Sequence, residues 1–355
     1  MRKILELDGS IINDAIEPSV ESEELLKWYQ SMIQLRLLDQ KGIKLQRQGR
    51  VGFHIFTTGQ EAHIGAAAAL NNQDWIFPAY REHGAAIYRD MPLEEIINHL
   101  FANDLDINKG RRLPGLFGNK KINFVNPSAP IGTQIIHATG AAYYASQINP
   151  EEVNIVFFGD GATSSSDFHS GLNFAGVYKT PTIFICMNNQ FAISVPLEKQ
   201  TASNTIADKA IAYGIKGEQV DGNDILAMYS AVKDAIKHAQ NGNGPTLIEA
   251  FTYRMGPHTS SDDPSRYRPD EEVEEWKLKD PIERFKKYLI RKDLISEEEN
   301  SIIYEHYDKK INELIEIADS RPKPKLETMF TDVYDTLPGS LLEQWEEVKF
   351  FTEED

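Results

Sequence analysis

The sequence predicts an α/β fold in which a doubly wound, mostly parallel sheet is flanked by helices. Two short apolar runs, 153–158 and 182–187, have the length and composition of strands that are buried on both faces. The segment 167–177 between them has helical character, so the three segments form a βαβ unit. A third apolar run, 246–253, follows another helix, and this alternation of strands and helices is typical of a doubly wound sheet.

Further helices are predicted from the spacing of apolar residues along the chain. Residues 1–20 form an extended arm, and helical periodicity begins at Ser22 and ends in the glycine-containing stretch 47–59. The segments 60–70 and 133–147 are predicted helices in which small residues are frequent. Both are therefore expected to pack closely against their neighbours.

The second half of the chain adds one more helix of the α/β unit and a long loop. The helix carries Ile225, Tyr229 and Val232 on one face, and Asn223 or Asp221 is expected to cap its N-terminus. The polar segment 255–270 is predicted to be a surface loop, and loops of that length are often functional.

The chain is expected to divide into three parts. These are an N-terminal arm and helix (1–50), an α/β domain (51–320) and a C-terminal tail (321–355). The tail begins with the proline-containing segment 321–325, which is predicted to be a stiff linker.

Composition and charge exclude several classes of protein. Hydrophobic residues make up 41% of the 355 residues and charged residues 26%, so a disordered, collagen-like or disulfide-stapled chain is excluded. The formal net charge of −17 argues against nucleic acid as a partner. No apolar run reaches the roughly 18 residues of a membrane span, and the first residues lack the apolar core of a signal peptide. With Cys186 as its one cysteine, the chain is expected to be a cytoplasmic protein without membrane contacts.

The candidate ligand site lies where the first two predicted strands end. Asp160 stands between two glycines at the end of the first strand, where open α/β sheets bind ligands. After the 26 residues 162–187, Asn188 and Asn189 end the next strand. Each motif alone is a common turn, but neighbouring strand ends would bring Asn189 close to Asp160. A carboxylate beside phosphate-binding amides implies a bridging cation, and Mg²⁺ suits hard oxygen ligands.

These motifs resemble a known family. Gly159-Asp160-Gly161 and Asn188-Asn189 match the thiamine-diphosphate-binding motif, whose fold is the doubly wound sheet described above. With the blocks 80–84, 128–134 and 254–263, the chain resembles the alpha subunit of the decarboxylating component of 2-oxo acid dehydrogenase complexes from about residue 20 onward. The ending 321–334 is more similar to the branched-chain (2-oxoisovalerate) members than to the pyruvate members.

The resemblance implies a role for each motif residue. Asp160, Asn189 and the backbone carbonyl of Phe191 would bind Mg²⁺. The residues that would contact thiamine diphosphate are Tyr80, Arg81, Ala129, Ile131, Gly161, Ala162 and His258. The residues that would hold a potassium ion are Ser128, Pro130, Thr133 and Gln134. Without the resemblance, these last four would be interpreted as a helix N-cap.

The resemblance makes His258 the catalytic residue that steadies the bound 2-oxo acid. An imidazole that titrates near working pH suits this role. The residues that would order its loop are Arg254, Asp262, Tyr267 and Arg268, and Thr259 stands where eukaryotic members carry a regulatory phosphoserine. Three residues depart from the family pattern: Met187 replaces an arginine, Gln190 a glycine and Ala129 a serine. They predict a pocket with one positive charge fewer, and the sequence leaves open what this does to cofactor affinity.

The implied function is that of one subunit of a larger enzyme. The reaction is oxidative decarboxylation of a branched-chain 2-oxo acid such as 3-methyl-2-oxobutanoate, with acyl transfer to lipoyl groups. The glutamate that activates the cofactor lies on a separate beta subunit in this family, so an α2β2 heterotetramer and a lipoyl acyltransferase are the expected partners. The alternatives are a pyruvate or acetoin dehydrogenase alpha subunit, a non-catalytic scaffolding subunit, or a phosphate-binding module of another family.

Overall fold

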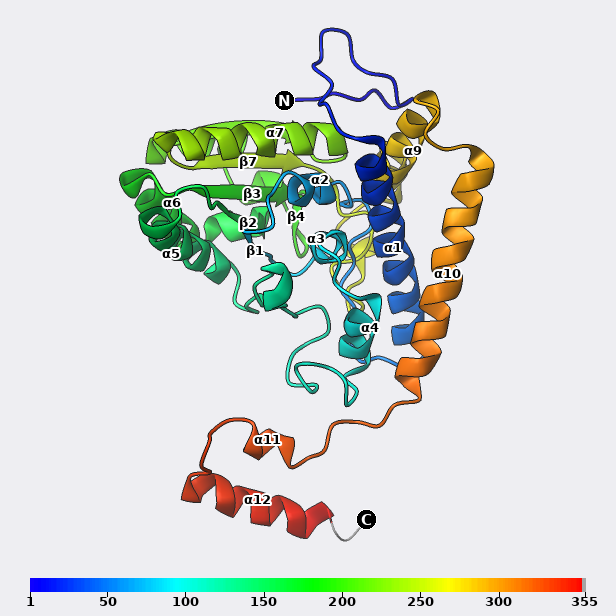
Figure 1. The fold of residues 1–355 in the computed structure, drawn as a ribbon, viewed down its shortest axis with the longest axis vertical. Helices are drawn as coiled ribbons and strands as arrows, with labels where there is room; N and C mark the ends of the chain where they lie inside the picture. The colour runs from blue at the N-terminus through cyan, green and yellow to red at the C-terminus, as the bar shows by residue number, and fades with distance from the viewer. Residues whose placement is uncertain (353–355) are drawn as a thin grey trace.

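The computed structural model describes residues 1–352, and a five-stranded parallel sheet lies at its centre. The strands are β1 (Trp75–Phe77), β2 (Asn154–Gly159), β3 (Thr182–Asn188), β6 (Lys216–Asp221) and β7 (Thr246–Phe251). They are ordered β1-β2-β3-β7-β6, and every neighbouring pair is parallel. Figure 1 shows α7 (Ile225–His238) over one face and α5 (Thr133–Ile148) with α6 (Ser166–Tyr178) over the other. The predicted doubly wound sheet is confirmed.

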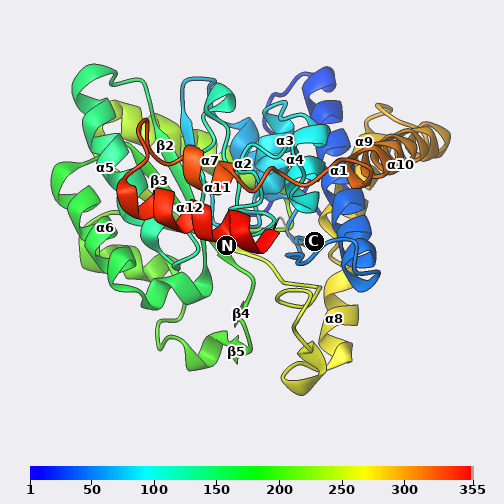
Figure 2. The same ribbon diagram turned by 90° about the horizontal axis from the view of Figure 1, so that it is seen from below.

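The remaining elements surround this sheet. The other α-helices are α1 (Ser22–Arg47), α2 (His63–Ala68), α3 (His83–Tyr88), α4 (Leu93–Phe101), α8 (Asp270–Lys277), α9 (Pro281–Arg291), α10 (Glu297–Asp319), α11 (Thr328–Thr331) and α12 (Gly339–Thr352). Short 3₁₀ turns occur at Lys120–Ile122, Asp160–Ser164, Leu197–Lys199, Ala207–Tyr213 and Pro264–Arg266, and a π-turn at Ala239–Asn243. A small hairpin of β4 (Phe191–Ala192) and β5 (Val195–Pro196) projects beyond the sheet, as Figure 2 shows.

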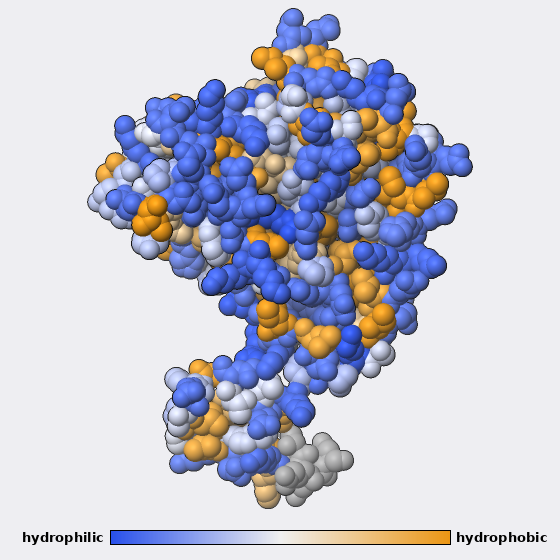
Figure 3. Space-filling model, viewed as in Figure 1, coloured by the Kyte–Doolittle hydropathy of each residue, from blue (hydrophilic) through white to orange (hydrophobic). Residues whose placement is uncertain are grey.

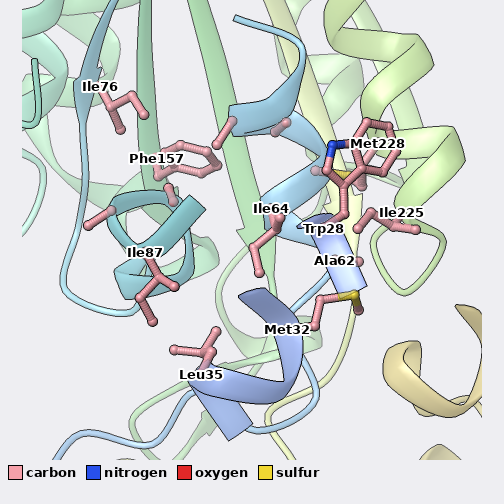
Figure 4. Close-up of a cluster of buried hydrophobic side chains, with 14 of the residues drawn as sticks. Trp28, Met32, Leu35, Ala62, Ile64, Ile76, Ile87, Phe157, Ile225 and Met228 are labelled. Carbon is pink, nitrogen blue, oxygen red and sulfur yellow. The ribbon is translucent and has the colours of Figure 1, made fainter. Parts of the chain in front are cut away.

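The side chains of β2 alternate between two hydrophobic cores. Ile155 and Phe157 face the core that α1, α2 and α7 share, whereas Val156 and Phe158 face the core beneath α5 and α6. Figure 4 shows the first of these cores, with Phe157 lying among side chains of α1, α2, α3 and α7. Because both faces are covered, the residues 155–158 are all apolar, which is why the strand stands out in the sequence.

Several predicted boundaries needed correction. The helix predicted over 60–70 is regular only in α2, and the strand predicted over 246–253 ends at Phe251. The expected cap of α7 was wrong: the Asp224 carboxylate, rather than Asn223 or Asp221, accepts the N–H groups of Leu226 and Ala227, each at 3.1 Å.

The N-terminal arm covers the outer edge of the sheet. Arg2 forms a parallel bridge with Val220 of β6, and its Nε donates to Glu218 at 2.6 Å. The N–H groups of Ile4 and Leu5 both donate to the buried Asp224 carboxylate at 2.7 Å. The arm therefore satisfies backbone groups that an open edge strand would expose.

The C-terminal segment lies beside the main body at the end of an irregular linker (Figures 1 and 2). The Asp332 carboxylate forms ion pairs with Nζ of Lys109 and Nη2 of Arg111, each at 2.5 Å. Figure 3 shows apolar side chains on the surface of this segment, and Phe350 and Phe351 are among the exposed ones. The division at residues 50 and 320 stays a prediction. Among residues 1–352, no helix combines the length and the apolarity that crossing a membrane requires.

Candidate functional site

The register of β2 and β3 places the two strand-end motifs side by side. Gly159 pairs with Met187, so both strands end at the same edge of the sheet and the chain continues into Asp160 and Asn189. Both of these residues line one cavity of about 280 Å³. The sequence predicted this meeting of strand ends from the βαβ order alone.

Most of the predicted site residues share this cavity. The predicted residues in its lining are Tyr80, Arg81, Ser128, Ile131, Gln134, Asp160, Gly161, Ala162, Asn189, Phe191 and His258. Ala129, Pro130 and Thr133 lie outside the lining, and Ala129 and Pro130 are exposed. The structure thus gathers segments that lie far apart in the sequence, while the roles of the individual residues stay predictions.

The region around the start of α5 is not an N-cap of the kind expected from the sequence. Gly132 holds the N-cap position with φ +95°, and no side chain caps the helix. The Thr133 hydroxyl instead donates to the Pro130 carbonyl at 3.2 Å, and Gln134 Nε2 donates to the Phe157 carbonyl at 3.0 Å. A role of these residues in binding potassium stays a prediction.

Asp160 is a buried carboxylate with one strong side-chain partner. Only 1% of its surface is exposed. Burial raises the pKa of Asp160, and the hydrogen bond from Gln200 opposes that rise. Gln200 Nε2 donates to Oδ2 of Asp160 at 2.6 Å. One carboxylate oxygen is therefore tied to the protein, and the carboxylate favours a cation as a further partner.

The turn after β3 supplies two more oxygen atoms. Asn189 donates from Nδ2 to Gln60 Oε1 at 3.1 Å, and the Phe191 carbonyl accepts from Arg254 Nη1 at 3.1 Å. Carboxylate, amide and backbone oxygens are hard ligands of the kind that Mg²⁺ takes. Within residues 1–352 no group of three His, Cys, Asp or Glu side chains forms a metal cluster, so a cation here would depend on this mixed oxygen set.

His258 is held in a defined charge state by Arg81. Arg81 Nη2 donates to Nδ1 of His258 at 3.1 Å and to its carbonyl at 3.0 Å. A guanidinium has no acceptor, so Nδ1 is the unprotonated nitrogen and the proton of the neutral ring resides on Nε2. Burial, together with the charges of Arg81 and Arg254, lowers the pKa of His258 to about 4. The expectation that this imidazole titrates near working pH was wrong.

The loop that carries His258 is fastened at several points. The Asp262 carboxylate accepts the His258 N–H at 2.6 Å and the Tyr267 hydroxyl at 2.5 Å. Tyr267 in turn accepts from Arg254 Nη2 at 2.9 Å, so the loop is connected to the turn that contains Phe191. The structure therefore orders this loop through Arg254, Asp262 and Tyr267, three of the four residues expected to do so.

Arg268, the fourth, acts on the backbone of the same loop. It donates from Nη2 to the Met255 carbonyl at 3.0 Å and from Nη1 to the Arg254 carbonyl.

Two departures from the family pattern have visible consequences. Gln190 has φ +73°, a left-handed conformation that explains why glycine is usual there, and its Nε2 donates to the Thr252 carbonyl at 2.8 Å. Met187 lines the cavity where an arginine is usual, so the cavity has an apolar wall at that point.

Sequence reasoning missed three polar residues of the lining and its surroundings. Gln60 lines the cavity and Gln200 contacts Asp160, but neither belongs to a motif with recognisable spacing. Glu82 lies within the block 80–84 and was given no role. Its burial raises the pKa of its carboxyl to about 7, and Oε2 accepts the N–H of Ala79 at 2.9 Å. The one sequence feature that could have indicated Glu82 was its place inside a block that was predicted to bind a ligand.

The sequence is similar to those of several known proteins. Residues 29–327 match the model of the family described as dehydrogenase E1 component. The chain is 42% identical over 346 residues to the human mitochondrial 2-oxoisovalerate dehydrogenase subunit alpha, covering 97% of this chain and 78% of that protein. It is 41% identical over 344 residues to subunit alpha 2 of the Arabidopsis thaliana mitochondrial enzyme, covering 96% and 73%. It is also 41% identical over 348 residues to the pyruvate dehydrogenase E1 component subunit alpha of Staphylococcus aureus MW2, covering 98% and 92%.

Proposed function

The chain belongs to the dehydrogenase E1 component family, and from this premise we propose that it is the alpha subunit of a branched-chain 2-oxo acid dehydrogenase E1 component. Its reaction is the oxidative decarboxylation of 3-methyl-2-oxobutanoate and related acids, with transfer of the acyl group to a lipoyl disulfide. The 42% identity to 2-oxoisovalerate dehydrogenase alpha subunits supports the substrate class. The observation that carries the proposal is that Asp160, Asn189 and His258 line one cavity.

The residues of the cavity fit thiamine diphosphate bound through Mg²⁺. Oxygens of Asp160, Asn189 and Phe191 would hold the cation, and Gly161 would let the backbone approach the diphosphate. A Cβ at Gly161 would lie 2.7 Å from the Cβ of Ala192, so the space there is already tight. The cofactor, when bound, supplies a carbanion nucleophile and an electron sink for decarboxylation. We also propose potassium at Ser128, Pro130, Thr133 and Gln134.

His258, whose ring is held by Arg81, would bind and orient the 2-oxo acid. A neutral His258 offers one donor, Nε2–H, which suits a carbonyl or carboxylate oxygen. Arg81 holds the ring through Nδ1 and is itself anchored by the Phe56 carbonyl, so the ring has little freedom to turn. Tyr80 packs edge-on against His258 with ring centroids 6.3 Å apart.

A beta subunit would complete the cavity. The volume of the cavity in this chain, about 280 Å³, lies just below the range that is usual for small-molecule sites. Ile131 at the cavity is 50% exposed, and exposed aromatic rings of Tyr143, Phe174 and Tyr178 contact one another on α5 and α6. Contiguous exposed apolar groups are typical of interaction surfaces. We propose a cytoplasmic α2β2 assembly that passes the acyl group to a lipoyl acyltransferase. The isolated chain should then bind thiamine diphosphate poorly.

A pyruvate dehydrogenase alpha subunit is the second candidate. The Staphylococcus aureus protein with that name is 41% identical to this chain, and the match covers 92% of that protein. Overall sequence similarity therefore does not decide between a branched-chain 2-oxo acid and pyruvate as the substrate.

Turnover by the co-expressed assembly tests the proposal. The chain is produced with candidate beta chains, and decarboxylation of 3-methyl-2-oxobutanoate is compared with that of pyruvate by using an artificial electron acceptor. The proposal expects the branched acid to have the higher kcat/KM. A clear preference for pyruvate would establish the second candidate. An assembly that binds thiamine diphosphate and turns over neither acid would contradict both.

A further inference from the structure

Gln60 presents a buried donor without a partner to the cavity. Its side chain is 2% exposed and lines the cavity just before α2. Its Nε2 has no hydrogen-bond acceptor within the described residues. Buried amide donors in native proteins are almost always paired, so an unpaired one in a cavity points to an acceptor on a ligand.

The orientation of this amide follows from its neighbours. The Phe191 N–H can only donate, and it donates to Oδ1 of Asn189 at 3.4 Å. Nδ2 of Asn189 therefore faces the other way and donates to Gln60 at 3.1 Å. Gln60 must present its oxygen to that N–H group, which leaves Nε2 as the free end of the amide.

The surroundings indicate what the acceptor is. Gln60 contacts Asn189, which lies beside the buried Asp160 at the end of the cavity where the oxygen ligands gather. A cation held by these oxygens would share its remaining positions with an anionic oxygen of the ligand. Arg81, another donor in the lining of the cavity, is already engaged by Phe56 and His258.

We infer that Gln60 is a binding residue of this site whose Nε2 donates to an oxyanion of the bound ligand. The oxyanion is a phosphate oxygen of the cofactor or the carboxylate of the 2-oxo acid. Asn189 acts as the partner that keeps the Gln60 nitrogen turned toward the ligand. The choice between these two sources rests on the proposed function, whereas the donor itself does not.

Two substitutions of Gln60 remove the Nε2 donor and differ in what they do to the hydrogen bond with Asn189. Gln60→Glu keeps an oxygen for Asn189 Nδ2, and Gln60→Met removes both polar atoms with little change in volume. They share only the loss of the Nε2 donor. The exposed Gln48, at the end of α1, gives the matched control Gln48→Met. Each variant is co-expressed with the beta chain, and its ligand-free melting temperature verifies that it folds.

Calorimetric titration with thiamine diphosphate in the presence of Mg²⁺ is the main measurement. Both Gln60 variants are expected to bind about tenfold more weakly than the wild type, while Gln48→Met is unchanged. Unchanged cofactor affinity with a similarly raised KM for the 2-oxo acid would assign the donor to the carboxylate. If either variant keeps both the wild-type affinity and the wild-type KM, the inference is overturned.

A titration with Mg²⁺ and inorganic pyrophosphate separates this inference from the proposed function. If the wild-type assembly fails to bind thiamine diphosphate, the proposed function fails. The inference that Gln60 donates to an oxyanion would still be supported if the wild type binds pyrophosphate and both Gln60 variants bind it more weakly. Equal pyrophosphate binding by all three proteins would then overturn the inference.

Discussion

Arg81 donates from Nη2 to Nδ1 of His258 across 3.1 Å, although 177 residues separate them in the sequence. This contact assigns the proton of the neutral imidazole to Nε2 and opposes protonation of the ring. It also connects the block 80–84, at the start of α3, to the long loop that follows β7. The geometry makes His258 a neutral hydrogen-bond donor and excludes an imidazolium at neutral pH.

Substituting Arg81 by methionine should raise the pKa of His258. Burial and the Arg81 charge both lower this pKa to about 4, so removal of the charge moves it part of the way back toward 6.5. An NMR titration of the His258 ring carbon signals measures the change. Tyr80→Phe keeps the ring packing and Arg81, and should leave the pKa as it is. An unaltered pKa in Arg81→Met would show that Arg81 does not set the charge state.

Substituting Gln200 by methionine should weaken Mg²⁺ binding by about 10- to 100-fold, as is usual when a partner of a ligating side chain is lost. Gln200 Nε2 donates to Asp160 at 2.6 Å and holds the carboxylate in place. The measurement is the Mg²⁺ concentration that gives half-maximal thiamine diphosphate binding. Gln48→Met serves as the control. Equal Mg²⁺ dependence in both variants would show that Asp160 needs no such support.

Glycines 159 and 161 offer a matched pair of substitutions. A Cβ at Gly161 would lie 2.7 Å from the Cβ of Ala192, whereas a Cβ at Gly159 meets nothing within 4 Å. Gly161→Ala should therefore displace the β4 hairpin next to Phe191 and cost about 1–3 kcal/mol in cofactor binding or stability. Gly159→Ala, which adds a methyl group to free space beside the cavity, should have little effect on the stability of the ligand-free protein. Calorimetric titration and thermal unfolding of both variants would test this, and similar behaviour of the two would be evidence against a tight approach at Gly161.

Burial of His63 should make the protein sensitive to mild acid. Burial lowers the pKa of His63 from 6.5 to about 4, and its Nε2 has no partner among the described residues. Between these two pH values the unfolded chain binds more protons than the folded one, so stability falls as pH falls. The loss from this group approaches about 3 kcal/mol near pH 4.

The substitution His63→Leu should flatten this part of the pH dependence. Chemical denaturation at several pH values gives the free energy of unfolding. The exposed His306 on α10 supplies the control His306→Leu. A dependence that is the same in His63→Leu and in the wild type would show that His63 is not its source.

The sequence predicts those features that depend on local pattern. Strands β2 and β3 are apolar over 155–158 and 183–187 because helices cover both faces, and the ends of these apolar runs therefore locate Asp160 and Asn189. The sequence did not predict strand β6, because Val220 is the only buried residue of this strand. The outer edge of the strand is covered by Arg2, which lies far away in the sequence at the N-terminus. Strand β1, with three residues, is too short to show a pattern.

The predictions about the site were limited by contacts between distant segments. The hydrogen bond between Gln60 and Asn189 joins residues that are 129 positions apart, so no local sequence pattern predicts it. The charge state of His258 was mispredicted for the same reason, since it depends on Arg81 and on burial. The motifs therefore predicted most residues that line the cavity, but the folded chain determines how these residues are oriented and charged.

The most direct test of the whole account is the substitution Asp160→Ala in the assembly with the beta chain. Decarboxylation of 3-methyl-2-oxobutanoate should be lost while sedimentation still shows the α2β2 assembly, because Asp160 would hold the cation and, at 1% exposure, offers almost no surface for subunit contact. The exposed Asp104 provides the control Asp104→Ala, which should keep full activity. Full decarboxylation by Asp160→Ala would contradict the account.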